Sequence, residues 1–278
     1  MKKQILTDNK ITAFKEYLIY GEKSKITVEK YIHDVKAFAD YANGAEITKD
    51  IVLAYKQMLI SKYAARSVNS KLASVNSLFL FLGWADCRVR SLKIQRQTYS
   101  PAEKELTKSE YMRLLHSAEK NKRLKLIIET ICGTGIRVSE LEYFTVEAVK
   151  NGTVTVSCKN KTRNIIVPSK LRKLLLNYAK KNGITGGIIF RTRSGKPVNR
   201  SNIWAEMKKL CKHANVNPSK VFPHNLRKLF ARTFYGIEKD IAKLANILGH
   251  SSIDTTRIYI ITTGIEHRRK IERLGLVV

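Results

Sequence analysis

The sequence has no long uninterrupted apolar run and few cysteines. No apolar run reaches the roughly 18 residues that a membrane-spanning helix needs, and the N-terminus, MKKQILTDNK, lacks the apolar segment of a secretory signal. Widely spaced cysteines without a CxxC pair are typical of reduced thiols, so we expect a cytoplasmic protein. The 278 residues include four cysteines: Cys87, Cys132, Cys158 and Cys211.

Acidic side chains are scarce compared with basic ones. The sequence has 52 lysines and arginines against 23 aspartates and glutamates, which gives a formal net charge of +29. Such an excess indicates a polyanionic partner, either nucleic acid or an anionic membrane surface, more than a basic surface that only aids solubility. Residues 1–100 carry 17 basic and 9 acidic side chains, and residues 101–278 carry 35 and 14. Because the excess is not confined to one short tail, we expect nucleic acid.

Two motifs of phosphate chemistry are absent. The sequence has no GxxxxGK[ST] loop and no paired acidic cluster of the kind that metal-dependent nucleases use. Cys211 and His213 are neighbours, but two candidate ligands do not make a metal site, and we interpret them as structural. We therefore expect neither a metal nor a nucleotide cofactor.

The first part of the chain predicts a small helical domain, which we place at residues 1–92. Apolar residues recur at helical spacing over residues 10–20, 24–43, 48–63 and 67–83, and Thr27 is the predicted N-cap of the second helix. Three basic residues near its turns either contact the DNA backbone or belong to a solvated face: Lys25, Arg66 and Lys71.

Residues 93–104 break the helical periodicity and predict a linker, followed by a second domain at 105–278. Thr107 and Glu110 form a capping-box pattern at its start. Two β-like runs, 153–156 and 164–167, flank the basic turn SCKNKTR and predict a hairpin. We expect a short strand at 188–190 and an otherwise helical domain, so the fold class is mainly α with a small hairpin. The predicted helices cover residues 106–120, 124–132, 138–144, 170–181, 201–213, 225–235, 237–248, 255–260 and 265–274.

Three clusters in the second domain contain basic residues, and the third also ends in a tyrosine: GTGIRVSE at 133–140, HNLR at 224–227 and LGHSSIDTTRIY at 248–259. Two arginines can each hold phosphate oxygens through a two-pronged hydrogen bond. A tyrosine can attack phosphorus and hold a broken strand covalently. Each residue alone has an ordinary interpretation as a surface charge, a helix cap or a core side chain. Together they predict phosphodiester chemistry.

The same motifs resemble those of the tyrosine recombinases of the Xer and phage-integrase group. GTGIRVSELE, CKNKTRNIIVP, HNLR and LGHSSIDTTRIY occur in that family's order and spacing. In the first domain, SKITVEKYIHDVKAFADYA and ARSVNSKLASVNSLFLFLG are similar to its core-binding domain. The resemblance covers nearly the whole chain. It implies a site-specific recombinase acting on double-stranded DNA in a bacterial-type nucleoid.

The resemblance assigns a role to each matched residue. Tyr259 would be the nucleophile that forms a 3′-phosphotyrosyl enzyme, and His224 would accept its proton. Arg137 and Arg227 would clamp the non-bridging phosphate oxygens, and His250 would add a hydrogen bond to them. A phenol loses its proton only near pH ~10, so such neighbours are needed. Glu140, three residues after Arg137, would orient Arg137 or a nearby histidine.

The general acid is the least defined role. Lys159 would protonate the leaving 5′-oxygen. Lys161 and Arg163 share the predicted turn, and the glycine that follows the lysine in the family is missing, since this chain reads Lys159-Asn160-Lys161. We favour Lys159 and keep Lys161 as the alternative. Lys161 and Arg163 are also candidate DNA contacts.

The resemblance leaves other activities open. The predicted helix at 265–274 would pack into a neighbouring protomer, giving a homotetramer on two DNA sites, or would pack on its own domain. The cellular role could be integration and excision, inversion, or dimer resolution through a Holliday junction. A DNA-binding protein without catalysis and a type IB topoisomerase that relaxes supercoils as a monomer are the alternatives. The target site and accessory proteins do not follow from the sequence.

Overall fold

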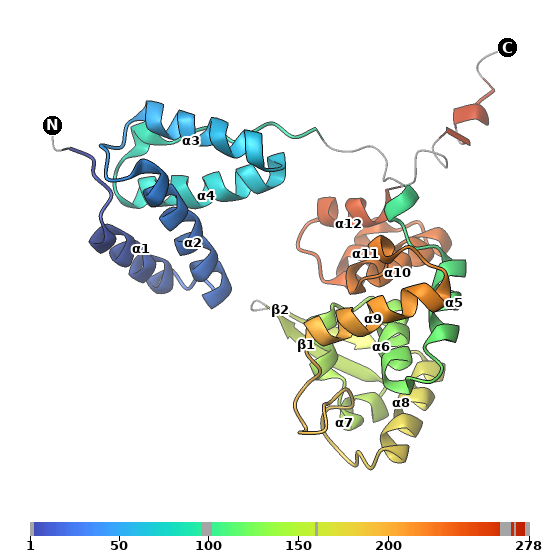
Figure 1. The fold of residues 1–278 in the computed structure, drawn as a ribbon. Coiled ribbons are helices and arrows are strands. Elements are labelled where there is room, and N and C mark those ends of the chain that lie inside the picture. Colours follow the sequence, from blue (N-terminus) through green and yellow to red (C-terminus); the bar gives the residue numbers. More distant parts are fainter. Residues whose placement is uncertain (1–2, 96–101, 159–160, 262–267, 270, 276–278) are drawn as a thin grey trace. The chain divides into compact units, whose positions relative to one another are not determined.

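The computed structural model describes all residues except 1–2, 96–101, 159–160, 262–267, 270 and 276–278. The chain forms two compact units, Met1–Arg96 and Gln97–Val278, and the division falls within residues 93–104. Helices build both units, and the second also contains an antiparallel hairpin (Figure 1). The predicted mainly helical fold class is thereby confirmed. No helix within the described residues is both long and apolar enough to cross a bilayer.

The first unit is a helical bundle. Its core includes Phe38, whose ring packs edge to face on Tyr55 and Phe79, with ring centroids 5.0 and 5.6 Å away. The predicted N-cap of the second helix is wrong. Ser24 caps this helix, and its Oγ accepts a hydrogen bond from the backbone N–H of Thr27 at 3.3 Å. The helices are α1 (Asp8–Tyr20), α2 (Lys25–Ala42), α3 (Lys49–Lys62) and α4 (Ala65–Phe81).

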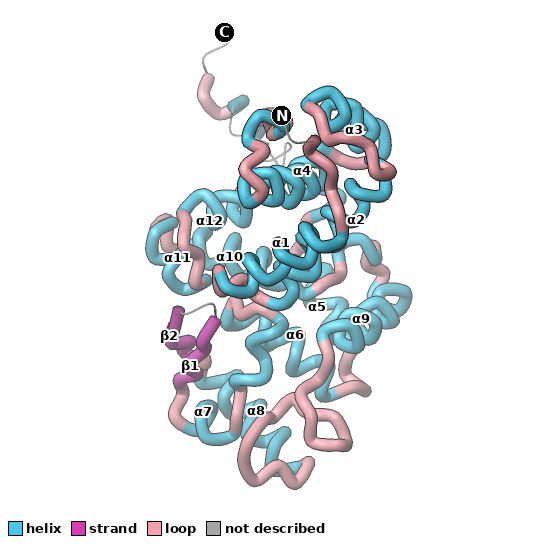
Figure 2. Tube along the Cα trace, turned by 90° about the vertical axis from the view of Figure 1, so that its left-hand side faces the viewer, coloured by secondary structure: helices cyan, strands magenta, loops and turns pink. Residues whose placement is uncertain are grey.

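The second unit is arranged around the apolar helix α6 (Lys122–Thr134), which packs against α8 and α10. Helices α11 and α12 pack against α10. Figure 2 shows the hairpin at one edge of this unit, between α7 and α11. The other elements are α5 (Lys108–Ser117), α7 (Val146–Lys150), β1 (Thr153–Cys158), β2 (Lys161–Ile166), α8 (Ser169–Lys181), α9 (Arg200–Ala214), α10 (Pro223–Ile237), α11 (Ile241–Leu248) and α12 (Ile253–Ile260).

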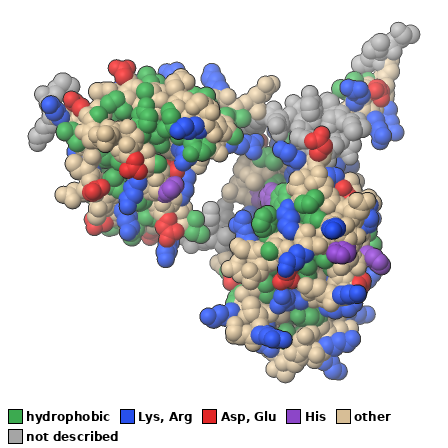
Figure 3. All heavy atoms as spheres, in the orientation of Figure 1, with side chains coloured by type: hydrophobic (Ala, Val, Ile, Leu, Met, Phe, Trp, Pro, Cys, Tyr) green, Lys and Arg blue, Asp and Glu red, His purple; other side chains and the backbone are tan. Residues whose placement is uncertain are grey.

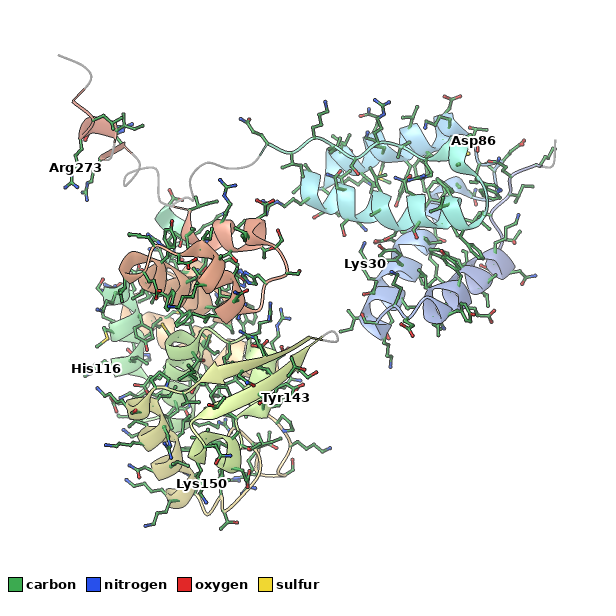
Figure 4. The ribbon with its side chains drawn as sticks, turned by 180° about the vertical axis from the view of Figure 1, so that it is seen from behind. Lys30, Asp86, His116, Tyr143, Lys150 and Arg273 are labelled. Atoms are coloured by element: carbon green, nitrogen blue, oxygen red, sulfur yellow. The ribbon has the colours of Figure 1, made fainter. Side chains whose placement is uncertain are left out.

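The hairpin strands are longer than the sequence predicts. The ladder continues until Cys158 pairs with Lys161. Lys161 and Arg163 therefore lie on strand β2, whereas the sequence predicted that they lie in the turn. The side chain of Tyr143 supports the hairpin near this end, because its hydroxyl donates to the carbonyl of Ser157 at 2.9 Å (Figure 4).

Three other local predictions are wrong. Residues 188–190 form no strand, since Ile188 makes an isolated bridge with Thr145. The helix expected over 138–144 is a 3-10 helix, η3 (Val138–Tyr143). The helix expected from residue 237 begins at Ile241, because Asp240 caps it by accepting the backbone N–H of Lys243 at 2.9 Å. In each case a tertiary contact or a cap decides the geometry, and apolar spacing does not.

A buried carboxylate joins α2 to α4. Asp34 is 4% exposed and accepts hydrogen bonds from Ser74 Oγ at 2.9 Å and Lys71 Nζ at 3.4 Å. The Nζ atom of Lys30, one turn before Asp34, lies 2.9 Å from Oδ2, the oxygen that Ser74 also contacts, and donates to the carbonyl of Ser70 (Figure 4). Burial raises the pKa of Asp34, but hydrogen bonds from Lys30 and Ser74 and the charges of both lysines hold that pKa below its ordinary value.

We expect Asp34→Ala to lower the free energy of unfolding of the first unit by about 1–3 kcal/mol, because it leaves buried donors unpaired. The stabilisation is present above the unfolded-state pKa of ~3.9 and is lost as the pH falls through the lower folded-state pKa. Urea unfolding of the full chain with Trp204→Phe lets the other tryptophan, Trp84, report on this unit. Asp40→Ala, at an exposed position of α2, is the control; an equal loss there would contradict the prediction.

Candidate active site

The candidate active site lies where the end of α6, the start of α10 and the turn between α11 and α12 meet. Helix α6 ends at Gly135, whose φ is +67°. A Cβ atom there would lie 2.4 Å from Cδ1 of Phe230, so α10 packs too closely for another residue. The tight turn directs the Gly135 carbonyl at Arg227 and places Arg137 at the start of η3.

Arg227, on α10, is 2% exposed and connects the parts of the site. Its Nη1 donates to the Gly135 carbonyl, and its Nη2 donates to the Leu248 carbonyl at 2.6 Å. Its buried Nε has no hydrogen-bond partner among the described residues, and an unpaired buried donor costs about 1–3 kcal/mol. An anionic oxygen would satisfy it. Burial, followed by the charge of Arg137, lowers the pKa of Arg227 to about 10, so it remains charged at neutral pH.

Tyr259 is 7% exposed and lies between two imidazoles. Its hydroxyl is 3.3 Å from Nδ1 of His224, and its ring centroid is 4.9 Å from that of His224 and 5.0 Å from that of His250. Burial, followed by the charges of Arg227, Lys228 and Arg137, holds the pKa of His224 below its ordinary value. A neutral His224 can accept the phenol proton.

His250 uses both ring nitrogens. Its Nε2 lies 3.0 Å from Nη2 of Arg227, and its Nδ1 lies 2.8 Å from Oγ1 of the buried Thr256. Because a guanidinium cannot accept a hydrogen bond, Nε2 must be the acceptor and Nδ1 must carry the proton. Burial, followed by the charge of Arg227, lowers the pKa of His250 to about 4. Thr256 was not predicted as a site residue, although it lies one helical turn before Tyr259 on α12.

Glu140 organises a second arginine pair. It is 2% exposed and accepts hydrogen bonds from Nη1 of Arg137 at 3.0 Å and Nη2 of Arg163 at 2.5 Å. It also accepts the Arg137 backbone N–H at 2.7 Å. Of the two predicted options, the structure therefore places Glu140 on Arg137 and not on a histidine. Arg163, which we expected among the DNA contacts, is mostly buried against this carboxylate.

A cavity of about 580 Å³ opens beside Arg137, His224 and Arg227. Its lining also includes Arg200, Ser201, Trp204 and Phe222, from α9 and the segment before α10. The side chains of Arg200 and Trp204 thus add a charge and an aromatic ring to the site. The sequence did not single them out, because an arginine and a half-exposed tryptophan on a helix carry no distinctive pattern.

The remaining predicted residues lie elsewhere. Lys159 is outside the described residues, and Lys161 is described only as the first residue of β2. In the first unit, Lys25 and Arg66 are exposed in the first turns of α2 and α4, whereas Lys71 pairs with Asp34 and lies over the ring of Tyr63. Lysines and arginines are spread over the visible faces of both units (Figure 3).

Comparisons with known families and proteins agree along the whole chain. The model of the phage integrase family matches residues 104–263, and that of the phage integrase N-terminal SAM-like domain matches residues 11–86. The chain is 29% identical to tyrosine recombinase XerA of Pyrococcus furiosus, over 100% of this chain and 98% of that protein. It is 26% identical to tyrosine recombinase XerC of Pediococcus pentosaceus, over 90% of this chain and 92% of that protein.

Solved structures show the same fold. A lambda integrase dimer bound to a COC′ core site matches with a TM-score of 0.76 and 19% identity, covering 94% of this chain and 96% of that one. The crystal structure of XerA recombinase matches with a TM-score of 0.55 and 25% identity, covering 98% of this chain and all of that one.

We expect His250 to remain neutral at pH 6, protonated on Nδ1, and to titrate only near pH 4. The physical reason is its burial next to the fixed charge of Arg227, whose donor occupies Nε2. Histidine ¹⁵N NMR of the full chain measures both properties, and His250→Gln assigns the signal. An Nε2-protonated ring, or titration near pH 6.5, would show that the Arg227 contact does not form.

Proposed function

Because the chain belongs to the phage integrase family, whose model matches more than half of it, we propose that it is a site-specific tyrosine recombinase. It cleaves and rejoins DNA strands through a 3′-phosphotyrosyl intermediate and a Holliday junction. The observation that carries the proposal is the contact of the Tyr259 hydroxyl with His224, beside the buried Arg227. The full-length similarity to proteins named XerA and XerC supports the same activity.

The reaction is a balanced exchange of esters. The Tyr259 oxygen attacks phosphorus while its proton passes to Nδ1 of His224. The bond from phosphorus to the 5′-oxygen breaks, and that oxygen leaves as a hydroxyl after it receives a proton. We assign this proton to Lys159, with Lys161 as the alternative. The new ester conserves the energy of the broken one, so a 5′-hydroxyl can reverse the step.

Fixed donors stabilise the charge that develops on the phosphate. The partly exposed guanidinium of Arg137 would hold one non-bridging oxygen, and Arg227 would hold the other once its side chain turns the unpaired, buried Nε toward the cavity that it lines. Such donors typically contribute about 10²–10³ each to the rate. His250 orients Arg227 by accepting a hydrogen bond from its Nη2. A bound phosphate would favour protonation of His250, and the protonated Nε2 would then donate the predicted hydrogen bond.

Two alternatives are less well supported. A binding protein without catalysis has no use for a buried tyrosine in contact with a histidine base, and the chain keeps all the other matched residues. A type IB topoisomerase would need neither the family's N-terminal domain nor the predicted helix at 265–274. Integration and excision, inversion and dimer resolution share one cleavage step.

We place this activity in the cytoplasm, where widely spaced cysteines stay reduced.

The decisive experiment uses nicked DNA fragments from the flanks of the protein's own gene, which trap a covalent intermediate. We expect an SDS-resistant protein–DNA adduct that Tyr259→Phe abolishes while it leaves DNA affinity unchanged, because the change removes only the attacking oxygen. Electrophoresis measures the adduct and gel shift measures binding. Tyr20→Phe serves as the control, since Tyr20 is an exposed tyrosine of α1 in the first unit. An adduct that persists in Tyr259→Phe would refute the nucleophile.

We also propose a homotetramer on two DNA sites, as in the lambda integrase tetramer bound to a Holliday junction. The predicted exchange helix, 265–274, lies partly outside the described residues. Two of its described apolar residues, Ile271 and Leu274, are 54% and 61% exposed and can pack on a neighbour.

Deleting residues 262–278 should leave binding to one site intact and abolish the four-protein complex in native electrophoresis. A stable tetramer of the deleted chain would contradict this assembly.

A further inference from the structure

Arg163 contacts two separate parts of the site from strand β2. Its Nη2 donates to Oε2 of Glu140 at 2.5 Å, and its Nη1 donates to the carbonyl of Ile247 near the end of α11. The side chain is 15% exposed. One guanidinium thus links the hairpin to the carboxylate that holds Arg137 and to the helix that precedes His250.

The turn before His250 is shaped to accept this side chain. A Cβ atom on Gly249 would lie 2.7 Å from Cδ and 2.8 Å from Nε of Arg163. Gly249 also has φ of +63°, a conformation that other residues rarely adopt. Arg137 reaches the same turn, because its Nη2 donates to the Gly249 carbonyl at 3.3 Å. The two arginines therefore both contact the turn that carries His250.

Charge explains why one arginine would depend on the other. Glu140 is buried, and its negative charge is shared between two guanidinium groups. Without Arg163, the whole attraction of this carboxylate would fall on Arg137, the more exposed of the two. Glu140 would then compete with a phosphate for Arg137, since ion pairs strengthen in a buried, weakly polarisable environment.

We propose that Arg163 is a positioning residue, which neutralises Glu140 so that Arg137 remains available to the scissile phosphate and which fixes the turn that carries His250. The proposal rests on the proposed recombinase function. It differs from a simple structural clamp, because it predicts that Glu140 becomes harmful to catalysis once Arg163 is gone.

The test measures single-turnover cleavage of the nicked substrate by Arg163→Met and Arg163→Lys. We expect Arg163→Met to cleave about 10²-fold more slowly, as for a misplaced catalytic group, with DNA affinity changed by less than about threefold. Arg163→Lys should recover part of the rate, because it keeps the charge but loses the fork of donors. The matched control is Arg172→Met, an exposed arginine of α8, which should cleave like the unmodified protein.

Glu140→Gln gives the readout that a structural role would not produce. In the unmodified protein it should slow cleavage, because Arg137 loses its anchor. In the Arg163→Met background it should speed cleavage, because it removes the competing charge. An Arg163→Met rate equal to that of Arg172→Met, or a further loss in the double variant, would overturn the proposal.

A second measurement separates this proposal from the proposed function. In the DNA-free protein, Arg163→Met should speed solvent exchange of the His250 ring N–H, seen by NMR, while Arg172→Met should not. If the unmodified protein forms no adduct but this exchange responds as expected, the recombinase assignment fails and the positioning of His250 stands. Unchanged exchange in Arg163→Met overturns the positioning role whatever the DNA result.

Discussion

The buried charge of Arg227 is the constraint on which the site depends. Burying a guanidinium is costly unless most of its donors are paired. Here the terminal nitrogens pair with the carbonyls of Gly135 and Leu248, at the ends of α6 and α11, and with His250, whereas Nε has no partner among the described residues. Both helices therefore have to end close to one point on α10. Tyr259 lies over the same guanidinium, with its ring centroid 5.9 Å from Cζ.

This constraint also explains why glycines begin the two catalytic turns. Gly135 and Gly249 are left-handed, and each lies against a bulky side chain, Phe230 in one case and Arg163 in the other. A turn that must expose a carbonyl while a neighbour packs on its Cα has little room for a Cβ atom. The glycines of GTGIR and LGH are thus part of the geometry that directs Arg137 and His250.

Local signals in the sequence predicted most of the architecture and the site. Apolar spacing located the helices, and three of the four motifs identified residues that the structure brings together near Tyr259, whereas Lys159 of the fourth motif lies outside the described residues. The contacts of Arg163 with Glu140 and of Thr256 with His250 were not predicted, because they depend on the hairpin register and on the approach of α12 to the His250 turn, which no local pattern encodes. The N-cap of α2 was misplaced for a simpler reason. Ser24 and Thr27 both offer a hydroxyl, and the start of the helix decides between them.

The burial of Tyr259 has a consequence for the lifetime of the intermediate. A phosphotyrosyl ester formed at this position would sit between His224, His250 and Arg227, where little bulk water can reach it. Water exclusion suppresses hydrolysis of reactive intermediates. The same packing that positions the phenol would therefore slow hydrolysis of the ester, which would leave a permanent strand break. The ester would then react mainly with a DNA hydroxyl.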